Sequence, residues 1–122
     1  IVLKPNMVVS GMECLRQAGV TEVAERTLRC LMRVVPPAVP GIAFLSGGQG
    51  SEEATTRLNT MNPRFGPHPW PLSFSFGRAL QEPALAAWRG VAENAAAAQE
   101  LLLKRARLNS AAIAGAYTGE TA

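Results

Sequence analysis

Three short apolar segments constrain most strongly how this chain can fold. They are Ile1–Lys4, Gly41–Ser46 and Leu72–Phe76, and residues with helical periodicity follow each of them. Their starts lie roughly 30 to 40 residues apart, the spacing of strand–helix units that build a parallel sheet. The alternation predicts an α/β fold, either an open doubly wound sheet or part of a (β/α) barrel. A barrel usually needs ~250 residues and eight strands, so a chain of this length with three strands gives at most an incomplete one.

The segments between the predicted strands favour helices. We expect helices over Thr21–Val35, from Ser51 to Asn62-Pro63, from about Gln81 to Trp88 and from about Glu93 to Ile113. Thr21 and Ser51 are the expected N-caps, because a side-chain oxygen there can accept a hydrogen bond from a free N–H of the first turn. The proline-rich stretch Pro63–Pro71 is expected to form an ordered loop.

Composition narrows the class of protein. Hydrophobic residues make up 48% and charged residues 17% of the chain, which is typical of a soluble globular protein. The net charge of +3 is spread out, and Lys104, Arg105 and Arg107 are expected to form a solvated helix face, so neither nucleic acid nor a membrane surface is an expected partner. Cys14 and Cys30 have no metal-ligand spacing and are expected to be reduced thiols.

Lys4 ends the first strand-like segment. Function in parallel α/β folds gathers at the carboxyl ends of strands. A lysine at a strand end is most often a solvated cation, because lysine is seldom buried. If the amine is partly shielded from water, it can instead attack a ketone and form a Schiff base. Both interpretations of Lys4 are open at this level.

The other two strand ends have features of phosphate-binding loops. Ser46-Gly47-Gly48 follows the second strand, and glycines let backbone N–H groups approach an anion closely. A helix start follows directly and adds further free N–H groups. Gly77-Arg78 follows the third strand, and a guanidinium matches the geometry of phosphate oxygens. Each feature alone is more often a turn or a surface ion pair, but together they predict a phosphate site.

These same segments resemble a known family. Leu3–Val8 resembles the Schiff-base lysine segment of class I fructose-bisphosphate aldolase. Val35–Gln49 is similar to the strand and loop that follow in that family, and Ser73–Gln81 is similar to its last strand. The resemblance runs in one register from Ile1 to about Tyr117.

The resemblance implies a fold and a domain. The family has a TIM (β/α)8 barrel, and this chain would supply its carboxyl-terminal three βα units, an incomplete barrel. Residues 1–122 would be a single partial barrel domain, with the βα units in 1–116 and a truncated tail in 117–122. The family's acid–base residues on earlier strands would be absent from the chain, and Phe76 stands where the family commonly has Tyr.

The resemblance also implies an activity. The family is a glycolytic, cytoplasmic lyase that forms homotetramers and reversibly cleaves fructose 1,6-bisphosphate to dihydroxyacetone phosphate and glyceraldehyde 3-phosphate. By this resemblance Lys4 would form the Schiff base, and four residues would hold a phosphate of the sugar substrate: Ser46, Gly47, Gly77 and Arg78. No metal and no cofactor are implied. The alternative is a catalytically inert fragment or paralogue that acts only as an interaction module.

Overall fold

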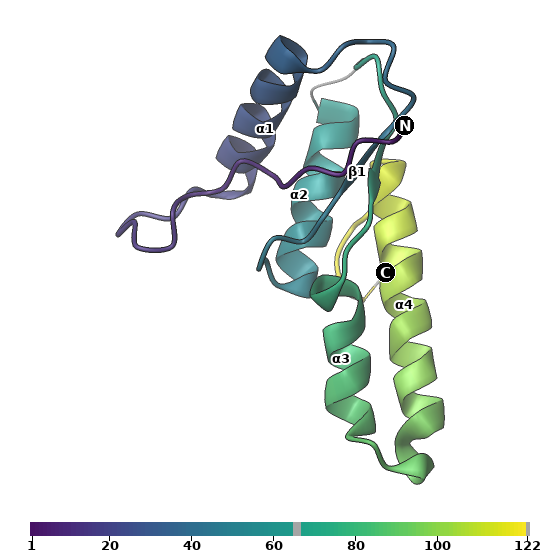
Figure 1. The fold of residues 1–122 in the computed structure, drawn as a ribbon. Helices are drawn as coiled ribbons and strands as arrows, with labels where there is room; N and C mark the ends of the chain where they lie inside the picture. Colours follow the sequence, from purple (N-terminus) through teal and green to yellow (C-terminus); the bar gives the residue numbers. More distant parts are fainter. Residues whose placement is uncertain (65–66, 122) are drawn as a thin grey trace.

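Helices and strands alternate along the chain, as predicted. The computed structural model describes residues 1–64 and 67–121 (Figure 1). The elements are α1 (Val20–Val34), β1 (Ile42–Phe44), α2 (Ser51–Arg64), β2 (Leu72–Phe74), α3 (Arg78–Trp88), a 3-10 turn (Ala92–Asn94) and α4 (Ala95–Ile113). β1 and β2 pair in parallel, and α2 connects them along the chain. The α/β class predicted from the alternation is therefore confirmed.

The first predicted strand is reduced to a single bridge. β1 and β2 pair with Ile42 opposite Leu72. The Ile1–Lys4 segment lies on the other side of β1, where Leu3 alone forms a parallel bridge to Ile42. Pro5 has no N–H and cannot continue the ladder, which explains why the expected strand does not extend. The prediction of a strand here was wrong, but the predicted parallel direction was correct.

Backbone carbonyls of glycine, and not the predicted side chains, begin the first two helices. Gly19 is the N-cap of α1, so Thr21 lies inside the helix. The carbonyl of Gly50 accepts the first intrahelical hydrogen bond of α2, at 2.9 Å, which places Ser51 inside the first turn. Both predicted N-caps were therefore displaced by one or two residues toward the amino end.

The other helix boundaries also differ from the prediction. α2 continues through Asn62-Pro63 to its last residue, Arg64. α3 begins at Arg78 and not near Gln81, because Gly77 is its N-cap and the Gly77 carbonyl accepts the first hydrogen bonds. Part of the loop predicted over Pro63–Pro71, residues 65–66, lies outside the described residues.

The end of that loop is ordered by two side chains. Trp70 is buried, and its indole N–H donates a 2.9 Å hydrogen bond to the carbonyl of Pro36. His68 lies 2.8 Å from the carbonyl of Met61 through Nε2, and its burial lowers the pKa of the imidazole. The sequence offered no partner for His68, because this contact depends on how the loop folds back onto α2.

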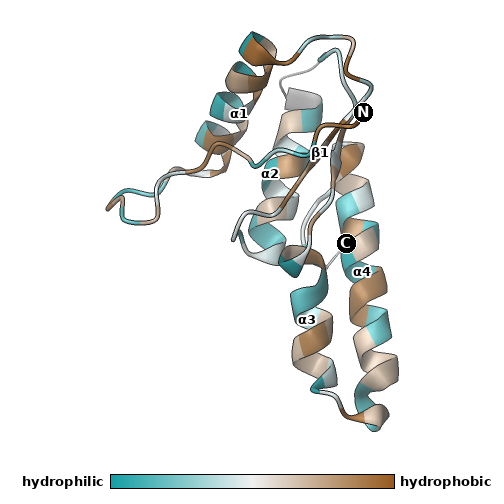
Figure 2. Cartoon of the chain, viewed as in Figure 1, coloured by the Kyte–Doolittle hydropathy of each residue, from teal (hydrophilic) through white to brown (hydrophobic). Residues whose placement is uncertain are grey.

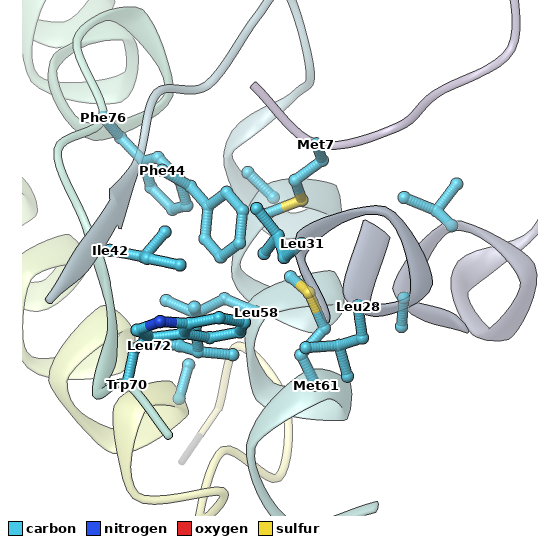
Figure 3. Packing of buried hydrophobic residues seen from close by; sticks show 14 of the residues in the cluster. Met7, Leu28, Leu31, Ile42, Phe44, Leu58, Met61, Trp70, Leu72 and Phe76 are labelled. Atoms are coloured by element: carbon cyan, nitrogen blue, oxygen red, sulfur yellow. The ribbon is translucent and has the colours of Figure 1, made fainter. Parts of the chain in front are cut away.

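One hydrophobic core joins the sheet to the helices (Figure 3). Phe44 of β1 is fully buried and points toward Leu31 of α1, while Leu58 and Met61 of α2 close the core from the other side. Met7, from the segment after Lys4, also enters this core. The chain that follows Lys4 is thus anchored by packing as well as by its bridge to β1.

α3 and α4 form a helical pair that extends beyond the sheet (Figure 1). Leu102 and Leu103 of α4 are 41% and 51% exposed.

Hydrophilic residues interrupt the labelled helices (Figure 2), and no helix among residues 1–64 and 67–121 is both long and apolar enough to cross a membrane.

Arg105 corrects the predicted solvated face of α4. Lys104 and Arg107 are exposed, but Arg105 is only 3% exposed. Its guanidinium donates to both carboxylate oxygens of Glu120, at 2.7 and 2.6 Å, and to the carbonyl of Ser51 at 2.8 Å. A cation on α4 therefore holds the segment after that helix against the first residue of α2.

Candidate functional site

Lys4 lies beside β1 in a fixed register. The Leu3 carbonyl accepts a hydrogen bond from Ala43 at 2.9 Å, and the Pro5 carbonyl accepts one from Leu45 at 3.0 Å. These two bonds flank Lys4 and fix its backbone even though it is not part of a regular strand. Because Leu3, Ile42 and Leu72 are in register, the next residues, Lys4, Ala43 and Ser73, form the adjacent row.

That row faces away from the core. Successive side chains of a strand point to opposite faces, and Ile42 and Leu72 are buried in the core. Lys4 and its two neighbours therefore project from the opposite face of the sheet. The neighbours are small and half-buried, and Lys4 itself is exposed. The shielding that would favour a Schiff-base lysine is not supplied by the residues of this chain that the structure describes.

The Ser46–Gly48 loop lies against the segment that carries Lys4. Gly47 has a φ of +55°, a conformation that favours glycine. It also packs so closely on Asn6 that an added Cβ would lie 2.6 Å from both Cγ and Nδ2 of the Asn6 side chain. Asn6 is fixed in turn, because its Oδ1 accepts a 2.9 Å hydrogen bond from the N–H of Met7. The loop and the lysine segment are thus in direct contact.

Free donors are present in this loop. Ser46 is buried, whereas Gly47 and Gly48 are exposed. Within residues 1–64 and 67–121, the N–H groups of Gly47 and Gly48 donate to no protein acceptor. Two adjacent free N–H groups on exposed glycines make a suitable cradle for an anion.

Gly77 and Arg78 leave the sheet at the same level as this loop. Phe44 and Phe74 are paired, so Gly47 and Gly77 each lie three residues beyond a matched pair. The sheet continues beyond that pair, because Ser75 donates a 2.7 Å hydrogen bond to the carbonyl of Phe44. Arg78 is the first residue of α3 and is exposed, so its side chain and the free N–H groups of the helix start are both accessible to a ligand.

The structure therefore brings the predicted site residues to one edge of the sheet. The five are Lys4, Ser46, Gly47, Gly77 and Arg78, and all of them lie on or after the carboxyl ends of three adjacent parallel segments. Asn6 was not singled out from the sequence, although its place two residues after Lys4 at a strand end was a usable signal. Among the described residues, no three His, Cys, Asp or Glu side chains lie together as a metal site would need.

Comparison with known proteins identifies the family. The family model for class I fructose-bisphosphate aldolase matches residues 1–122. The chain belongs to the class I fructose-bisphosphate aldolase family. The resemblance that the lysine segment and the two glycine loops indicated is thereby confirmed.

Aldolases from distant organisms match the chain at similar levels. Fructose-bisphosphate aldolase 1 of Toxoplasma gondii is 55% identical over 118 residues, which is 97% of this chain and 32% of that protein. Aldolase B of Gallus gallus is 55% identical over 95% of the chain and 32% of its own length. The chloroplastic aldolase 2 of Pisum sativum is 56% identical over 98% of the chain and 34% of its own length. The chain spans about a third of the relatives it matches.

A solved aldolase has the same fold over this region. The structure of fructose-bisphosphate aldolase from Plasmodium falciparum, in complex with TRAP and a small-molecule inhibitor, superimposes with a TM-score of 0.92 at 53% sequence identity. The superposition covers 97% of this chain and 34% of that chain. The fold is therefore that of the TIM-barrel aldolases over the third that they share.

An ion-pair network supports the start of α2, directly after the Ser46–Gly48 loop. Tyr117 donates a 2.7 Å hydrogen bond to Glu120, which also pairs with Arg105. Burial and this hydrogen bond raise the pKa of Tyr117 to about 12. Burial raises the pKa of Glu120, but the hydrogen bonds from Arg105 and Tyr117 outweigh it, so that the pKa of this carboxyl lies below its ordinary value. Glu120 is therefore held in its charged form.

Proposed function

We propose that this chain supplies the Schiff-base lysine and one phosphate clamp of a class I fructose-bisphosphate aldolase. The observation that carries the proposal is the gathering of Lys4, the Ser46–Gly48 loop and Gly77-Arg78 at one edge of the sheet. In fold terms, residues 1–116 are the last three βα units of a (β/α)8 barrel and residues 117–122 belong to the tail. The substrate is a phosphorylated ketose.

In the proposed reaction, Lys4 is the nucleophile. Its amine attacks the ketone carbon of fructose 1,6-bisphosphate, and loss of water gives a protonated imine. The bond between the carbon adjacent to the imine carbon and the hydroxyl-bearing carbon beyond it then breaks. Its electron pair forms the C=C bond of an enamine while the C=N π pair moves to nitrogen, and the hydroxyl gives up its proton as its carbon becomes the aldehyde. Glyceraldehyde 3-phosphate leaves, the enamine is protonated on carbon, and hydrolysis releases dihydroxyacetone phosphate and the free amine. Groups outside this chain transfer these protons.

The phosphate clamp holds the ketose over Lys4. The N–H groups of Gly47 and Gly48, the N–H of Gly77 and the Ser46 hydroxyl are the proposed donors, and Arg78 adds a positive charge with a planar pair of donors. Arg78 also lies at the start of α3, where the helix dipole favours an anion. We further propose that the assembled protein is a cytoplasmic homotetramer that works in glycolysis without a metal or cofactor.

Trapping with borohydride tests the assignment. The protein that carries this chain is mixed with dihydroxyacetone phosphate and reduced, and peptide mass mapping locates the adduct. The chain has two lysines, Lys4 and Lys104, and the second lies exposed on α4, so it serves as a matched control. We expect the adduct on Lys4, its loss in Lys4→Ala and its retention in Lys104→Ala. An adduct on Lys104, or on no residue of the chain, would leave the inert interaction module as the better account.

A further inference from the structure

A buried hydrogen-bond chain lies behind the glycines of the phosphate loop. Gln49 follows Gly47 and Gly48 and is 8% exposed, and Arg57, two turns along α2, is 6% exposed. Nη1 of Arg57 donates a 2.9 Å hydrogen bond to Oε1 of Gln49. Nε2 of Gln49 donates a 2.9 Å hydrogen bond to the carbonyl of Ser46, which also accepts the Gln49 N–H at 3.0 Å. The amide of Gln49 thus links the guanidinium to the first residue of the loop.

The chemistry of this chain allows one orientation of the amide. A guanidinium has only donors, so the Gln49 oxygen must face Arg57 and the Gln49 NH2 must face the Ser46 carbonyl. If the amide were rotated by half a turn, the Gln49 NH2 would face the donors of Arg57 and the Gln49 oxygen would face the carbonyl oxygen of Ser46. Arg57 therefore fixes Gln49, and Gln49 fixes the turn that contains both glycines.

Gly47 packs against Asn6, but packing does little to hold Gly48 in place. An open cleft of about 150 Å³ lies beside the loop, and its lining includes Gly47, Gly48, Gln49 and Arg57. Both glycines have positive φ angles, and an added Cβ at Gly48 would meet nothing within 4 Å. On this side of the loop, hydrogen bonding through Gln49 is the constraint that the structure provides.

Arg57 is itself anchored at two further points. Its Nη2 lies 2.8 Å from a carboxylate oxygen of Glu53, one turn earlier in α2, and 3.3 Å from the carbonyl of Ala18, just before α1. Glu53 is half exposed, with 48% of its side chain accessible. The guanidinium therefore joins α2, the loop and the chain entering α1, and only the bond to Gln49 leads to the glycines.

We propose that Arg57 and Gln49 are positioning residues that hold the N–H groups of Gly47 and Gly48 in the orientation that binds the substrate phosphate. The inference rests on the proposed function of this loop. Neither side chain touches the substrate in this scheme. Arg57 acts through Gln49. Its positive charge is paired with Glu53, so direct attraction between Arg57 and the phosphate is not part of the proposal.

Comparing a phosphorylated and an unphosphorylated ketone isolates this role. In the full-length protein, the rate of borohydride-trapped adduct at Lys4 is measured against the concentration of dihydroxyacetone phosphate and, separately, of dihydroxyacetone. Gln49→Met removes the hydrogen bonds with little change in side-chain length, and Arg57→Met removes the guanidinium while keeping an apolar stem. We expect each to raise the half-saturating concentration of the phosphorylated ketone about tenfold, equivalent to ~1.4 kcal/mol, with the maximal rate unchanged. The value for dihydroxyacetone should stay within about twofold.

Two further variants separate hydrogen bonding from charge. Glu53→Gln removes the ion pair but keeps the bond from Arg57 to Gln49, so it should behave as the unaltered protein does. The double variant of Arg57→Met and Gln49→Met should be no weaker than Gln49→Met alone, because both changes break the same chain. A double variant that is weaker by the product of the two effects would show that Arg57 acts by its charge.

The outcomes distinguish this inference from the function it rests on. If both ketones weaken equally, or if both variants retain full selectivity for the phosphorylated ketone, the positioning role is wrong while the proposed function stands. If the unaltered protein forms no adduct at Lys4 with either ketone, the proposed function itself is wrong.

Discussion

Replacing Gly47 by alanine should disturb the contact between the phosphate loop and the lysine segment. The φ of +55° at Gly47 costs an alanine ~1–2 kcal/mol, and reduced freedom of the unfolded chain returns ~0.4–1 kcal/mol. The new Cβ would also lie 2.6 Å from two atoms of the Asn6 amide, so that side chain must rotate away. Asn6 then loses its 2.9 Å hydrogen bond from Met7, worth ~1 kcal/mol, and adopts a poorer rotamer at ~1 kcal/mol. We expect the free energy of unfolding to fall by about 2–3 kcal/mol.

Gly48 provides the matched control. It also has a positive φ, of +83°, but nothing within 4 Å of an added Cβ. Gly48→Ala should therefore incur the backbone strain alone and reduce the free energy of unfolding by about 1 kcal/mol or less. Urea unfolding of the intact protein, followed by circular dichroism, measures both changes.

A double-mutant cycle with Asn6 tests the stated cause. Asn6→Ala removes the side-chain atoms that the new Cβ would meet, so Gly47→Ala in that background should cost no more than Gly48→Ala does. The coupling free energy between the two positions should be ~1–2 kcal/mol. Equal destabilisation by the two glycine replacements, or a coupling indistinguishable from zero, would refute the contact as the reason for glycine at this position.

Two further changes test the support around the site. Glu120→Gln weakens charged hydrogen bonds with Arg105 and should cost about 2 kcal/mol at neutral pH. Folding lowers the pKa of Glu120, so its contribution to the free energy of unfolding is fully present above the ordinary glutamate pKa of about 4.3 and is lost as the pH falls through the folded value. The urea midpoint of Glu120→Gln should therefore depend less on pH between 7 and 3 than that of the unaltered protein. Phe44→Ala, at a fully buried position, should lower the free energy of unfolding by ~3–5 kcal/mol. Leu102→Ala, on the exposed face of α4, should lower it by well under 1 kcal/mol in the same assay. Similar losses for the two variants would place Phe44 outside the core.

Local sequence was sufficient for the parts of the fold that depend on local patterns. The apolar run around Ile42 and the one around Leu72 are buried strands that pair in parallel, as the spacing of the strand–helix units predicted. Helix starts were displaced because Gly19 and Gly50 begin α1 and α2 through backbone carbonyls, whereas the prediction relied on side-chain caps. Every residue has a backbone carbonyl, so a helix start that relies on one is not marked by a polar side chain in the sequence. The two helix starts were misplaced for this reason.

Contacts between distant segments were beyond the sequence. Arg105 was expected to face water, yet it is paired with Glu120 and Ser51, the latter 54 residues away along the chain. A signal did exist, since Arg105 lies on the helical stripe shared with the buried residues Leu108 and Ala112. Arg57 is another charged residue of a type that is usually exposed. Only the folded structure brings Gln49 and the carbonyl of Ala18 to its guanidinium.

The contact between Asn6 and Gly47 also bears on the order of folding. The two residues are separated by about 40 residues, and the pairing of Leu3 with Ile42 spans a similar loop, so both require closure of a long chain segment. The contact between the proposed phosphate cradle and Asn6 forms only when the lysine segment docks beside β1. A single closure event would thus assemble the proposed nucleophile and the proposed anion cradle together. Adduct formation at Lys4 would then report, in a refolding experiment, the arrival of this last segment and not the earlier formation of the helices.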